Sequence, residues 1–312
     1  MMPSKFEKGE IAMLTSEMIK QRARELGASV CGIGRVYDEP DAQRDPRQIL
    51  PNAKSIIGFG FVIPKMFFEN MNRSVQYYTY TTLGVKYPDE ELAEIFLLKI
   101  GGMIEDEGYD ACLQKSVPNL RVQGDKTTNP EVMDTYELVH ATAVAEGKPV
   151  PDVIIDFGKA AEACGIGQRG LSGKILSPKY GPYIRYCFII TDAPLDFDEP
   201  ISAPVCDGCG ECIKACPGKA IGKDGLDTWQ CSVYYKGAHK SNPFMTEEFL
   251  KDDPEREAII NGEKRFDAAS AREIYPKMKF LPDTQWGYSA CLCGRACDRV
   301  CYEHLIGGKN ER

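Results

Sequence analysis

The sequence predicts an α+β protein in which a core of mixed helices and strands is followed by a separate cysteine-rich part. The chain has 312 residues, a length that suggests roughly two domains of about 100–200 residues each. Segments with helical and with strand-like apolar spacing alternate, and no internal repeat is visible. Nine of the 13 cysteines follow residue 200. We therefore expect the core over residues 1–200 and the cysteine-rich domain over residues 201–312, with an insertion at about 241–289.

The first expected elements of the core are one helix and two strands. Residues 15–26 begin with an N-cap-like Thr15, continue with apolar residues at helical spacing, and end at Gly27. Residues 28–34 and 55–64 are short apolar runs, and turn signals precede the second of them. Runs of this length and composition are typical of buried strands.

The second half of the core is expected to contain one long helix and one further strand. Residues 89–107 are strongly amphipathic and are followed by Gly108. Residues 122–152 are polar with few periodic apolar positions, which predicts a surface excursion or a segment covering an active site. Residues 184–192 form an apolar strand, and Pro200 marks the expected start of the domain boundary.

Composition and charge exclude several classes of function. The net charge is −8 and the sequence pI is about 5.2, which argues against non-specific nucleic-acid binding because that function needs a basic surface. No apolar run approaches the ~18 residues of a membrane-spanning helix. The N-terminal residues are charged where a signal peptide would be apolar. These features predict a cytoplasmic protein with no membrane contact.

The spacing of the cysteines after residue 200 indicates iron–sulfur clusters. In a reducing cytoplasm, many cysteines indicate metal binding or catalysis rather than disulfides. Residues 206–217 read C-x2-C-x2-C-x3-C-P, the bacterial ferredoxin spacing for a [4Fe–4S] cluster. In this pattern the fourth cysteine ligates a different cluster, so a second cluster is expected. Zinc ribbons are the alternative, but they use paired C-x2-C units.

The two-fold logic of a two-cluster ferredoxin divides the cysteines into two ligand sets. The first set is Cys206, Cys209, Cys212 and Cys301. The second set is Cys216, Cys231, Cys297 and one of Cys293 or Cys291, of which we favour Cys293. The remaining cysteines, which lie in apolar or helical contexts and are expected to be small buried side chains, are Cys31, Cys112, Cys164 and Cys187.

A glycine-rich segment over residues 153–201 carries a resemblance to a known family. An Asp is followed by G-x-G-x-R, a P-x-Y-G motif, a strand, TD-x-P-L and then the ferredoxin cysteines. This order resembles the epoxyqueuosine reductases and the reductive dehalogenases, which are related cobalamin-dependent iron–sulfur reductases. Residues 25–34, 44–61 and 227–237 are also similar to segments of that family, so the resemblance covers about three-quarters of the chain.

The resemblance implies a nitroreductase-like α/β core that binds cobalamin, followed by a ferredoxin-like domain with two [4Fe–4S] clusters that reduce the cobalt. It implies that Asp156 is the proton donor, and a carboxyl acting as an acid near neutral pH needs a raised pKa, which the flanking apolar residues are expected to supply. An ordinary capping Asp is the alternative. The residues implied to lie against the corrin are Gly165, Gly167, Gln168, Arg169, Ser177, Tyr180, Gly181 and Arg185.

The chain also departs from the family pattern. It lacks an Asp-Tyr-His stretch in residues 75–92 and the helical-repeat tail of longer epoxyqueuosine reductases. These departures and the negative charge favour a small-molecule substrate over tRNA, as for a paralogue with a substrate of its own. An external donor such as ferredoxin or flavodoxin is expected to supply the electrons. The alternatives are an electron-transfer or activator protein without corrinoid, and a flavin-binding reductase. Tyr80 and Tyr136 are conceivable substrate-side donors, although packing is the more ordinary role for each.

Overall fold

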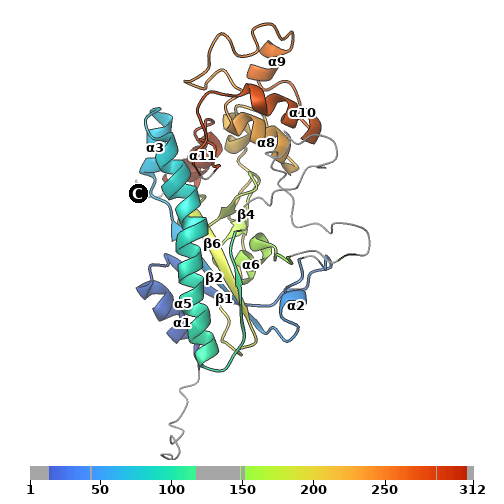
Figure 1. Cartoon of the computed structure of the whole chain (residues 1–312). Helices are drawn as coiled ribbons and strands as arrows, with labels where there is room; N and C mark the ends of the chain where they lie inside the picture. The colour runs from blue at the N-terminus through green and yellow to red at the C-terminus, as the bar shows by residue number, and fades with distance from the viewer. Residues whose placement is uncertain (1–13, 43, 117–147, 149–151, 286, 308–312) are drawn as a thin grey trace, which may run out of the picture.

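The computed structural model describes residues 14–42, 44–116, 148, 152–285 and 287–307. In Figure 1 a sheet lies beside a long helix, and the cysteine-rich part of the chain covers one end of both. The protein combines helices and strands, as the sequence predicts. In the described part of the chain, no helix is long and apolar enough to cross a membrane.

The core sheet has four antiparallel strands in the order β1-β2-β6-β3. Their bounds are Val30–Arg35 for β1, Ser55–Val62 for β2, Ile184–Thr191 for β6 and Ala111–Gln114 for β3. Three of these strands confirm the expected runs at 28–34, 55–64 and 184–192. The sequence analysis did not predict β3, which has four residues and is half-buried throughout.

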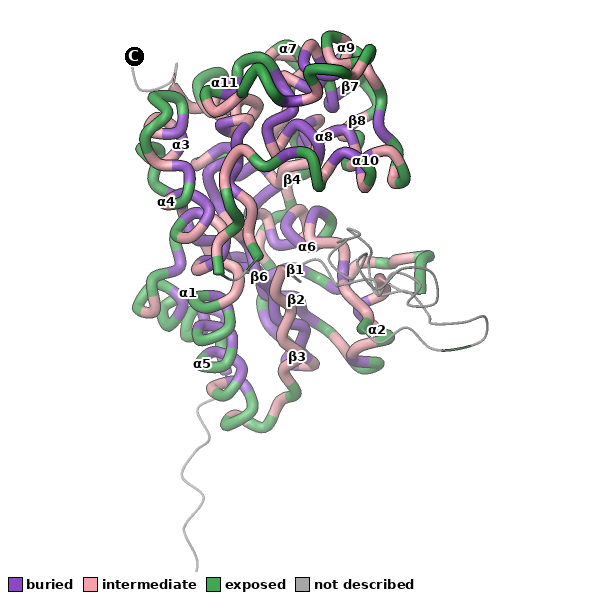
Figure 2. Tube along the Cα trace, turned by 45° about the horizontal axis from the view of Figure 1, so that its top comes forward, coloured by how far each residue is buried: buried purple, intermediate pink, exposed green. Residues whose placement is uncertain are grey.

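Both faces of the sheet are apolar because helices cover both. Ile33, Ile57 and Ile189 are paired across three strands and face α1 (Ser16–Glu25) and α5 (Ala93–Asp106). The next residues along the strands, such as Ile56 and Ile190, face α6 (Phe157–Ala163) on the opposite side. Figure 2 shows the buried strands between the exposed outer faces of these helices. A continuous apolar run such as 55–62 is what a strand covered on both faces requires.

The long helix begins earlier than the sequence predicts. After α2 (Pro46–Ile49), the chain forms α3 (Met66–Asn72) and α4 (Tyr77–Thr81) and then η1 (Thr82–Leu92), a π-helical stretch that leads directly into α5. The expected start was residue 89, where the amphipathic pattern of residues 89–107 begins. Pro88 lies inside the π-helix, where the wider turn accommodates a residue without a backbone N–H.

The glycine-rich segment and the cysteine-rich region follow the sheet. The segment forms the small hairpin of β4 (Gln168–Arg169) and β5 (Ile175–Leu176). The cysteine-rich region contains α7 (Glu211–Ala215), β7 (Ile221–Gly222), β8 (Gly225–Leu226), α8 (Thr228–Tyr235) and α11 (Ala296–Leu305). The expected insertion forms α9 (Arg256–Ile260), α10 (Ala268–Ile274) and η3 (Tyr275–Lys277), and its apolar side chains pack with those of α8.

One apolar cluster is shared by the core and the cysteine-rich region. It contains Phe68 of α3 and Tyr183, which precedes β6, together with residues 290–292. The rings of Phe68 and Tyr183 are stacked with centroids 3.8 Å apart, and Tyr302 of α11 stacks on the other face of Tyr183 at 4.3 Å. The two parts of the chain are therefore joined by packed side chains as well as by the backbone.

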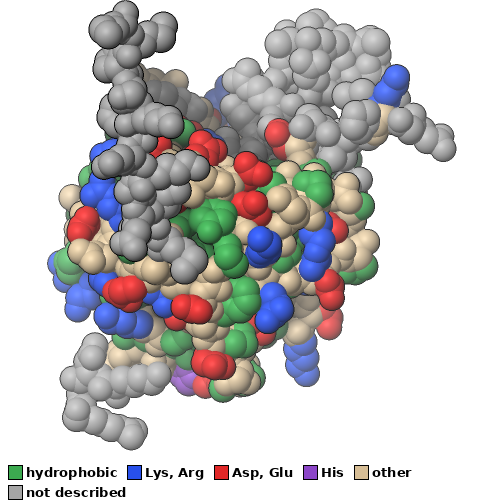
Figure 3. All heavy atoms as spheres, turned by 90° about the horizontal axis from the view of Figure 1, so that it is seen from below, with side chains coloured by type: hydrophobic (Ala, Val, Ile, Leu, Met, Phe, Trp, Pro, Cys, Tyr) green, Lys and Arg blue, Asp and Glu red, His purple; other side chains and the backbone are tan. Residues whose placement is uncertain are grey.

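The surface of the core carries charges of both signs. Figure 3 views the molecule from below, where acidic and basic side chains alternate with scattered apolar ones. Among these charges are ion pairs on α1, such as Arg24 with Glu17 at 2.6 Å. This mixed pattern agrees with the modest net charge of −8.

Candidate functional site

Asp156 is the N-cap residue of α6. Its Oδ1 accepts hydrogen bonds from the backbone N–H groups of Gly158 at 2.7 Å and Lys159 at 3.1 Å. These are two of the N–H groups that a helix leaves without intrahelical partners at its start. The sequence therefore places an acceptor where the local backbone needs one, which is the capping role that we weighed as the alternative to catalysis.

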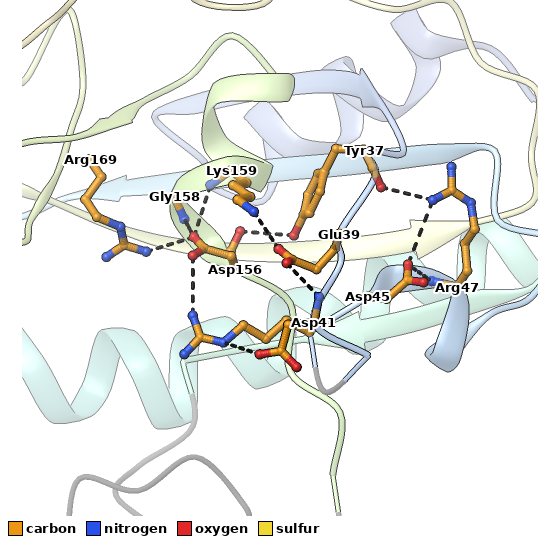
Figure 4. Close-up of polar contacts among 10 residues, drawn as sticks. Tyr37, Glu39, Asp41, Asp45, Arg47, Asp156, Gly158, Lys159 and Arg169 are labelled. Carbon is orange, nitrogen blue, oxygen red and sulfur yellow. Dashed lines mark hydrogen bonds and ion pairs between the residues drawn. The ribbon is translucent and has the colours of Figure 1, made fainter.

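Two arginines from distant parts of the chain also surround this carboxylate (Figure 4). Arg169 of β4 donates to Asp156 Oδ1 at 2.8 Å, and Arg44 lies 3.6 Å from Oδ2. Burial raises the pKa of Asp156, but the hydrogen bond and charge of Arg169 and the two backbone N–H groups outweigh it and lower the pKa. The expectation of a raised pKa is therefore wrong for this arrangement. Burial desolvates the group, but Arg169 and the two backbone N–H groups stabilise its charged form more strongly.

The loop before α2 completes the surroundings of Asp156. Tyr37 donates its hydroxyl to the backbone carbonyl of Asp156 at 3.2 Å, and Lys159 pairs with Glu39 at 2.7 Å (Figure 4). The hydrogen bonds hold the 37–45 loop against the start of α6. Asp156 thus lies in a polar network of six ionisable or hydroxyl groups rather than in an apolar pocket.

The glycines of the 153–201 segment are needed by the protein's own packing. A Cβ on Gly165 would lie 2.4 Å from the carbonyl oxygen of Glu199, and a Cβ on Gly167 would lie 2.6 Å from the hydroxyl of Tyr186. Gly165 also has a φ of +68°, which favours glycine. We expected these glycines to allow a large ligand to approach the backbone. In the structure, protein atoms occupy the space beside both.

The polar side chains expected at the corrin are also engaged within the protein. Gln168 donates to Glu162 at 3.2 Å and accepts from the backbone N–H of Val205 at 2.9 Å. Arg185 of β6 donates to the carbonyl of Gly84 at 3.2 Å and lies 3.2 Å from Asp89. Arg169 is likewise bonded to Asp156, so all three polar side chains already have partners within the protein.

The remaining predicted corrin residues form a tight turn after β5. Ser177 and Gly181 exchange two backbone hydrogen bonds of 2.9 and 2.8 Å, and Gly181 has a φ of +56°. Tyr180 is half-buried at the tip, where Lys179 lies 5.0 Å from its ring centroid. The structure thus brings the predicted corrin residues together along one hairpin and turn, apart from Arg185 on the adjacent strand.

Four of the predicted ligand cysteines line one pocket. They come from the loop before α7, from α7 itself and from α11, which packs against α7: Cys206, Cys209, Cys212 and Cys301. We call them the outer group because Cys209 is exposed. The glycine-rich hairpin forms the opposite wall of the pocket through Leu171, Ser172 and Leu176. Burial is the main cause that raises the pKa of the Cys301 thiol to about 12, and the other three cysteines add to the shift.

The other predicted ligand cysteines form a second group, which is more deeply enclosed. Cys231 and Cys297 each interact electrostatically with Cys293, and Cys216 also affects Cys231. We call these four residues the inner group. Cys291 is fully buried in the apolar cluster shared with the core, whereas Cys293 is half-buried, and their sulfurs are 3.7 Å apart. This placement favours Cys293 over Cys291 as the fourth member.

Of the four cysteines expected to be buried background thiols, Cys164 and Cys187 are buried, whereas Cys31 and Cys112 are half-buried. The thiol of Cys164 donates to the carbonyl of Ile56 at 3.3 Å. Burial raises the pKa of the Cys31 thiol to about 12. Tyr80 is only 2% exposed and packs near Phe68, as expected for a packing residue, whereas Tyr136 lies outside the described residues.

The sequence analysis named Arg185 but missed the other charged residues near it, Arg295, Asp298, Asp89 and Lys174. Arg295 lies between two inner cysteines in the sequence and pairs with Asp298 at 2.5 Å, while Arg185 pairs with Asp89 on η1. Lys174 of the hairpin turn interacts with both arginines, yet no hydrogen bond or ion pair to its ammonium exists among the described residues. Burial, with the repulsion of the two arginines, lowers the pKa of Lys174 to about 7.

The arrangement provides two sulfur-rich sites, of which the outer one is lined by the glycine-rich hairpin and the inner one lies beside Arg295 and Asp298. Four thiols gathered in one place are suited to hold a soft metal centre, because thiolates are the usual ligands of iron–sulfur clusters. A zinc site also accepts four thiolates. The cysteine spacing, and not the geometry alone, distinguishes the two.

Comparisons with known proteins agree with the motifs. An epoxyqueuosine reductase from Bacillus cereus is 25% identical over 253 residues, which are 78% of this chain and 53% of that protein. One from Listeria monocytogenes is 32% identical over 122 residues, which are 36% of this chain and 30% of that protein. A tetrachloroethene reductive dehalogenase from Sulfurospirillum multivorans is 40% identical over 65 residues, which are 20% of this chain and 13% of that protein. The chain spans about half the length of these relatives or less.

The similarity to solved structures is weaker than the similarity in sequence. The epoxyqueuosine reductase of Bacillus subtilis matches with a TM-score of 0.48 and 17% identity, covering 95% of this chain and 83% of that one. A reductive dehalogenase structure has the same TM-score and 15% identity, covering 92% of this chain and 42% of that one. No protein-family model matches the chain. By its sequence matches, the chain is similar to epoxyqueuosine reductases and, over a shorter stretch, to a reductive dehalogenase.

Proposed function

We propose that the protein is an oxidoreductase in which two [4Fe–4S] clusters pass single electrons to a cobalamin and then to a substrate that loses oxygen or another leaving group. One observation carries the proposal: eight cysteines spread over 96 positions, from 206 to 301, lie in two spatial groups of four. In this proposal residues 1–200 form a nitroreductase-like core, and residues 201–312 form a ferredoxin-like domain.

The donor chemistry of both groups fits iron–sulfur clusters. The outer group, Cys206, Cys209, Cys212 and Cys301, would hold a cluster near the surface, where an external donor such as ferredoxin or flavodoxin can approach. The inner group, Cys216, Cys231, Cys293 and Cys297, would hold the second cluster nearer the core. Electrons would then move inward from the exposed cluster to the enclosed one.

The cobalamin part of the proposal rests on the relatives, because one of the structures compared above concerns cobalamin-dependent dehalogenation. When bound, cobalamin supplies a strongly reducing and nucleophilic cobalt. The fit of this chain is only partial, since Gln168, Arg169 and Arg185 already have protein partners. This observation favours a second candidate function, an electron-transfer protein without corrinoid. A flavin-binding reductase is the third.

Asp156 is proposed as the proton donor on the basis of the resemblance alone. In the described arrangement it is held as a carboxylate by Arg169 and the helix start, and a carboxylate has no proton to give. The role therefore requires that Arg169 leave Asp156 before the proton is taken up. Asp156→Asn should abolish turnover while both clusters stay intact, and unimpaired turnover would remove Asp156 from the mechanism.

The substrate class is tested by binding. The net charge of −8 favours a small molecule, whereas one epoxyqueuosine reductase structure, which covers 93% of this chain, contains a tRNA stem loop. The charge of this chain and the ligand of that structure therefore favour different substrate classes. A tRNA stem loop labelled at one end should therefore be titrated with the reconstituted protein at two salt concentrations. Binding that persists at the higher salt would contradict the small-molecule preference.

The cofactors are tested by anaerobic reconstitution of the full chain. We expect about eight iron and eight sulfide per chain, four of each per cluster. Cys231→Ser and Cys293→Ser should each halve the iron, whereas Cys291→Ser and the matched control Cys187→Ser, a buried thiol of β6, should not. Zinc instead of iron would refute the cluster proposal. Chromatography of an acid extract then separates the three candidates, because it yields a corrinoid, a flavin or neither.

A further inference from the structure

Two basic residues occupy the same position in the two cysteine runs. Lys214 is the middle residue of C-I-K-A-C at 212–216, and Arg295 is the middle residue of C-G-R-A-C at 293–297. Each pairs with a carboxylate three positions away, Lys214 with Glu211 and Arg295 with Asp298. The two basic residues are therefore equivalent in position, but the carboxylate precedes Lys214 and follows Arg295, and the two pairs differ in what surrounds them.

Their burial is opposite. The side chains of Lys214 and Glu211 are 71% and 42% exposed, whereas those of Arg295 and Asp298 are 13% and 1% exposed. Arg295 contacts the same oxygen of Asp298 through both Nε, at 2.7 Å, and Nη2, at 2.5 Å. Water screens the first pair, and the protein interior leaves the second largely unscreened.

Arg295 has an unusual backbone conformation, which the ion pair with Asp298 helps to hold. Arg295 has a φ of +51°, the left-handed region that side-chain-bearing residues rarely adopt, at the start of α11. Such a conformation is strained and persists only where surrounding contacts favour it. The enclosed pair with Asp298 is such a contact, and the thiol of Cys297 lies 3.7 Å from Asp298 Oδ1.

We propose that Arg295 is a positioning residue that sets the reduction potential of the inner cluster, balanced by Asp298. The inference rests on the proposed function, since it requires a cluster at the inner group. Reduction of a cluster adds one negative charge, and net charge near the sulfurs is one of the levers that set cluster potentials. An enclosed guanidinium stabilises the reduced form, and the adjacent carboxylate opposes it. Removal of the charge of Arg295 or of Asp298 leaves the other charge without a counter-charge, in a part of the protein where water screens it poorly.

The two partners are therefore expected to act in opposite directions. Arg295→Gln leaves the carboxylate of Asp298 unbalanced, so the inner cluster becomes harder to reduce. Asp298→Asn leaves the guanidinium unbalanced, so the inner cluster becomes easier to reduce. Lys214→Gln is the matched control, because it removes the equivalent charge from the exposed pair. We expect at least a tenfold change in the ratio of reduced to oxidised inner cluster for each inner variant, which is 59 mV for a one-electron couple.

The experiment is an anaerobic redox titration of the reconstituted full chain, followed by EPR. The inner signal is identified as the one that Cys231→Ser removes. Opposite shifts for Arg295→Gln and Asp298→Asn, with less than a threefold change for Lys214→Gln, would support the inference. Arg295→Lys keeps the charge and should restore the potential to within threefold, and it replaces Arg295→Gln if that variant fails to assemble.

Two negative results can be distinguished. If the wild-type protein holds both clusters and the inner potential does not move, or moves in the same direction in both inner variants, the inference about Arg295 is overturned alone. If wild-type protein assembles no inner cluster by iron content and EPR, the proposed function is overturned and this inference falls with it.

Discussion

Substitutions at Asp156 should separate its capping role from its charge. Asparagine keeps an oxygen that accepts from the backbone N–H groups of Gly158 and Lys159 but removes the charge that pairs with Arg169. The side chains of that ion pair are 15% and 50% exposed, so its loss should cost about 0.2–1 kcal/mol. Alanine also removes the cap, which adds about 1 kcal/mol. We therefore expect about 0.5 kcal/mol for Asp156→Asn and about 1.5–2 kcal/mol for Asp156→Ala.

The assay is equilibrium unfolding in urea, with the free energies of the two variants compared at equal slope. Asp227 is a matched control, because it caps α8 by accepting from Gln230 and has no ion pair among the described residues. At that position asparagine should cost less than it does at position 156. Equal destabilisation by Asp156→Asn and Asp156→Ala would refute the reasoning, since the charge and not the cap would then dominate.

The ion pair of Asp156 and Arg169 predicts that the free energy of unfolding depends on pH. The folded protein lowers the pKa of Asp156, so the unfolded chain binds more protons as the solution becomes acidic. The stability contributed by the carboxylate is present above the unfolded pKa of about 3.9 and is lost as the pH falls through the folded value. The difference in unfolding free energy between wild type and Asp156→Asn should accordingly be larger at pH 6 than at pH 3. A difference that stays constant would show that the charge contributes nothing.

Three further predictions concern the core and the charged region. Phe96→Ala should cost about 3–5 kcal/mol in urea unfolding, because the ring packs edge-on against two phenylalanines of β2, and a cost below about 1 kcal/mol would contradict that packing. Gly32→Ala should lower the melting temperature markedly, since a Cβ would lie 2.0 Å from the backbone oxygen of Cys164, whereas Gly102→Ala, with open space around it, should not. For Lys174, burial lowers the pKa to about 7, so the folded protein gains stability as the pH rises from 7 towards 10, and Lys174→Met should lose this gain. Identical pH dependence in wild type and Lys174→Met would be evidence against the depressed pKa.

Local patterns predicted the elements that local chemistry determines. Strands β1, β2 and β6 are continuous apolar runs, and the cap at Thr15 is where the sequence places it. The start of the long helix was missed because the amphipathic pattern begins at residue 89, whereas the helical backbone already begins in the π-helical stretch that contains Pro88. Four-residue β3 has no pattern long enough to be recognised.

At the site, the cysteine assignment rests on sequence spacing, whereas the pKa of Asp156 depends on residues that folding brings to it. The assignment of the cysteines to two ligand sets follows from a spacing rule and stays a prediction, although the structure does place the first set around one pocket. The lowered pKa of Asp156 depends on Arg169, 13 positions after it, and on the backbone N–H groups of Gly158 and Lys159, so the apolar residues beside it in the sequence gave the wrong direction. Arg295 had a usable signal, its equivalence to Lys214, but only burial distinguishes the two positions.

The stacked rings of Phe68, Tyr183 and Tyr302 have a thermodynamic consequence for cofactor assembly. Tyr302 directly follows Cys301, so a cluster that immobilises Cys301 also fixes the outermost ring of the stack. Anything that binds the folded form in preference to the unfolded one stabilises every element that unfolds with it. Binding of a cluster by the outer group should therefore raise the melting temperature of the sheet, because the ring stack connects Cys301 to α3 and to the start of β6. Near-ultraviolet circular dichroism of the stacked tyrosines would report that coupling directly.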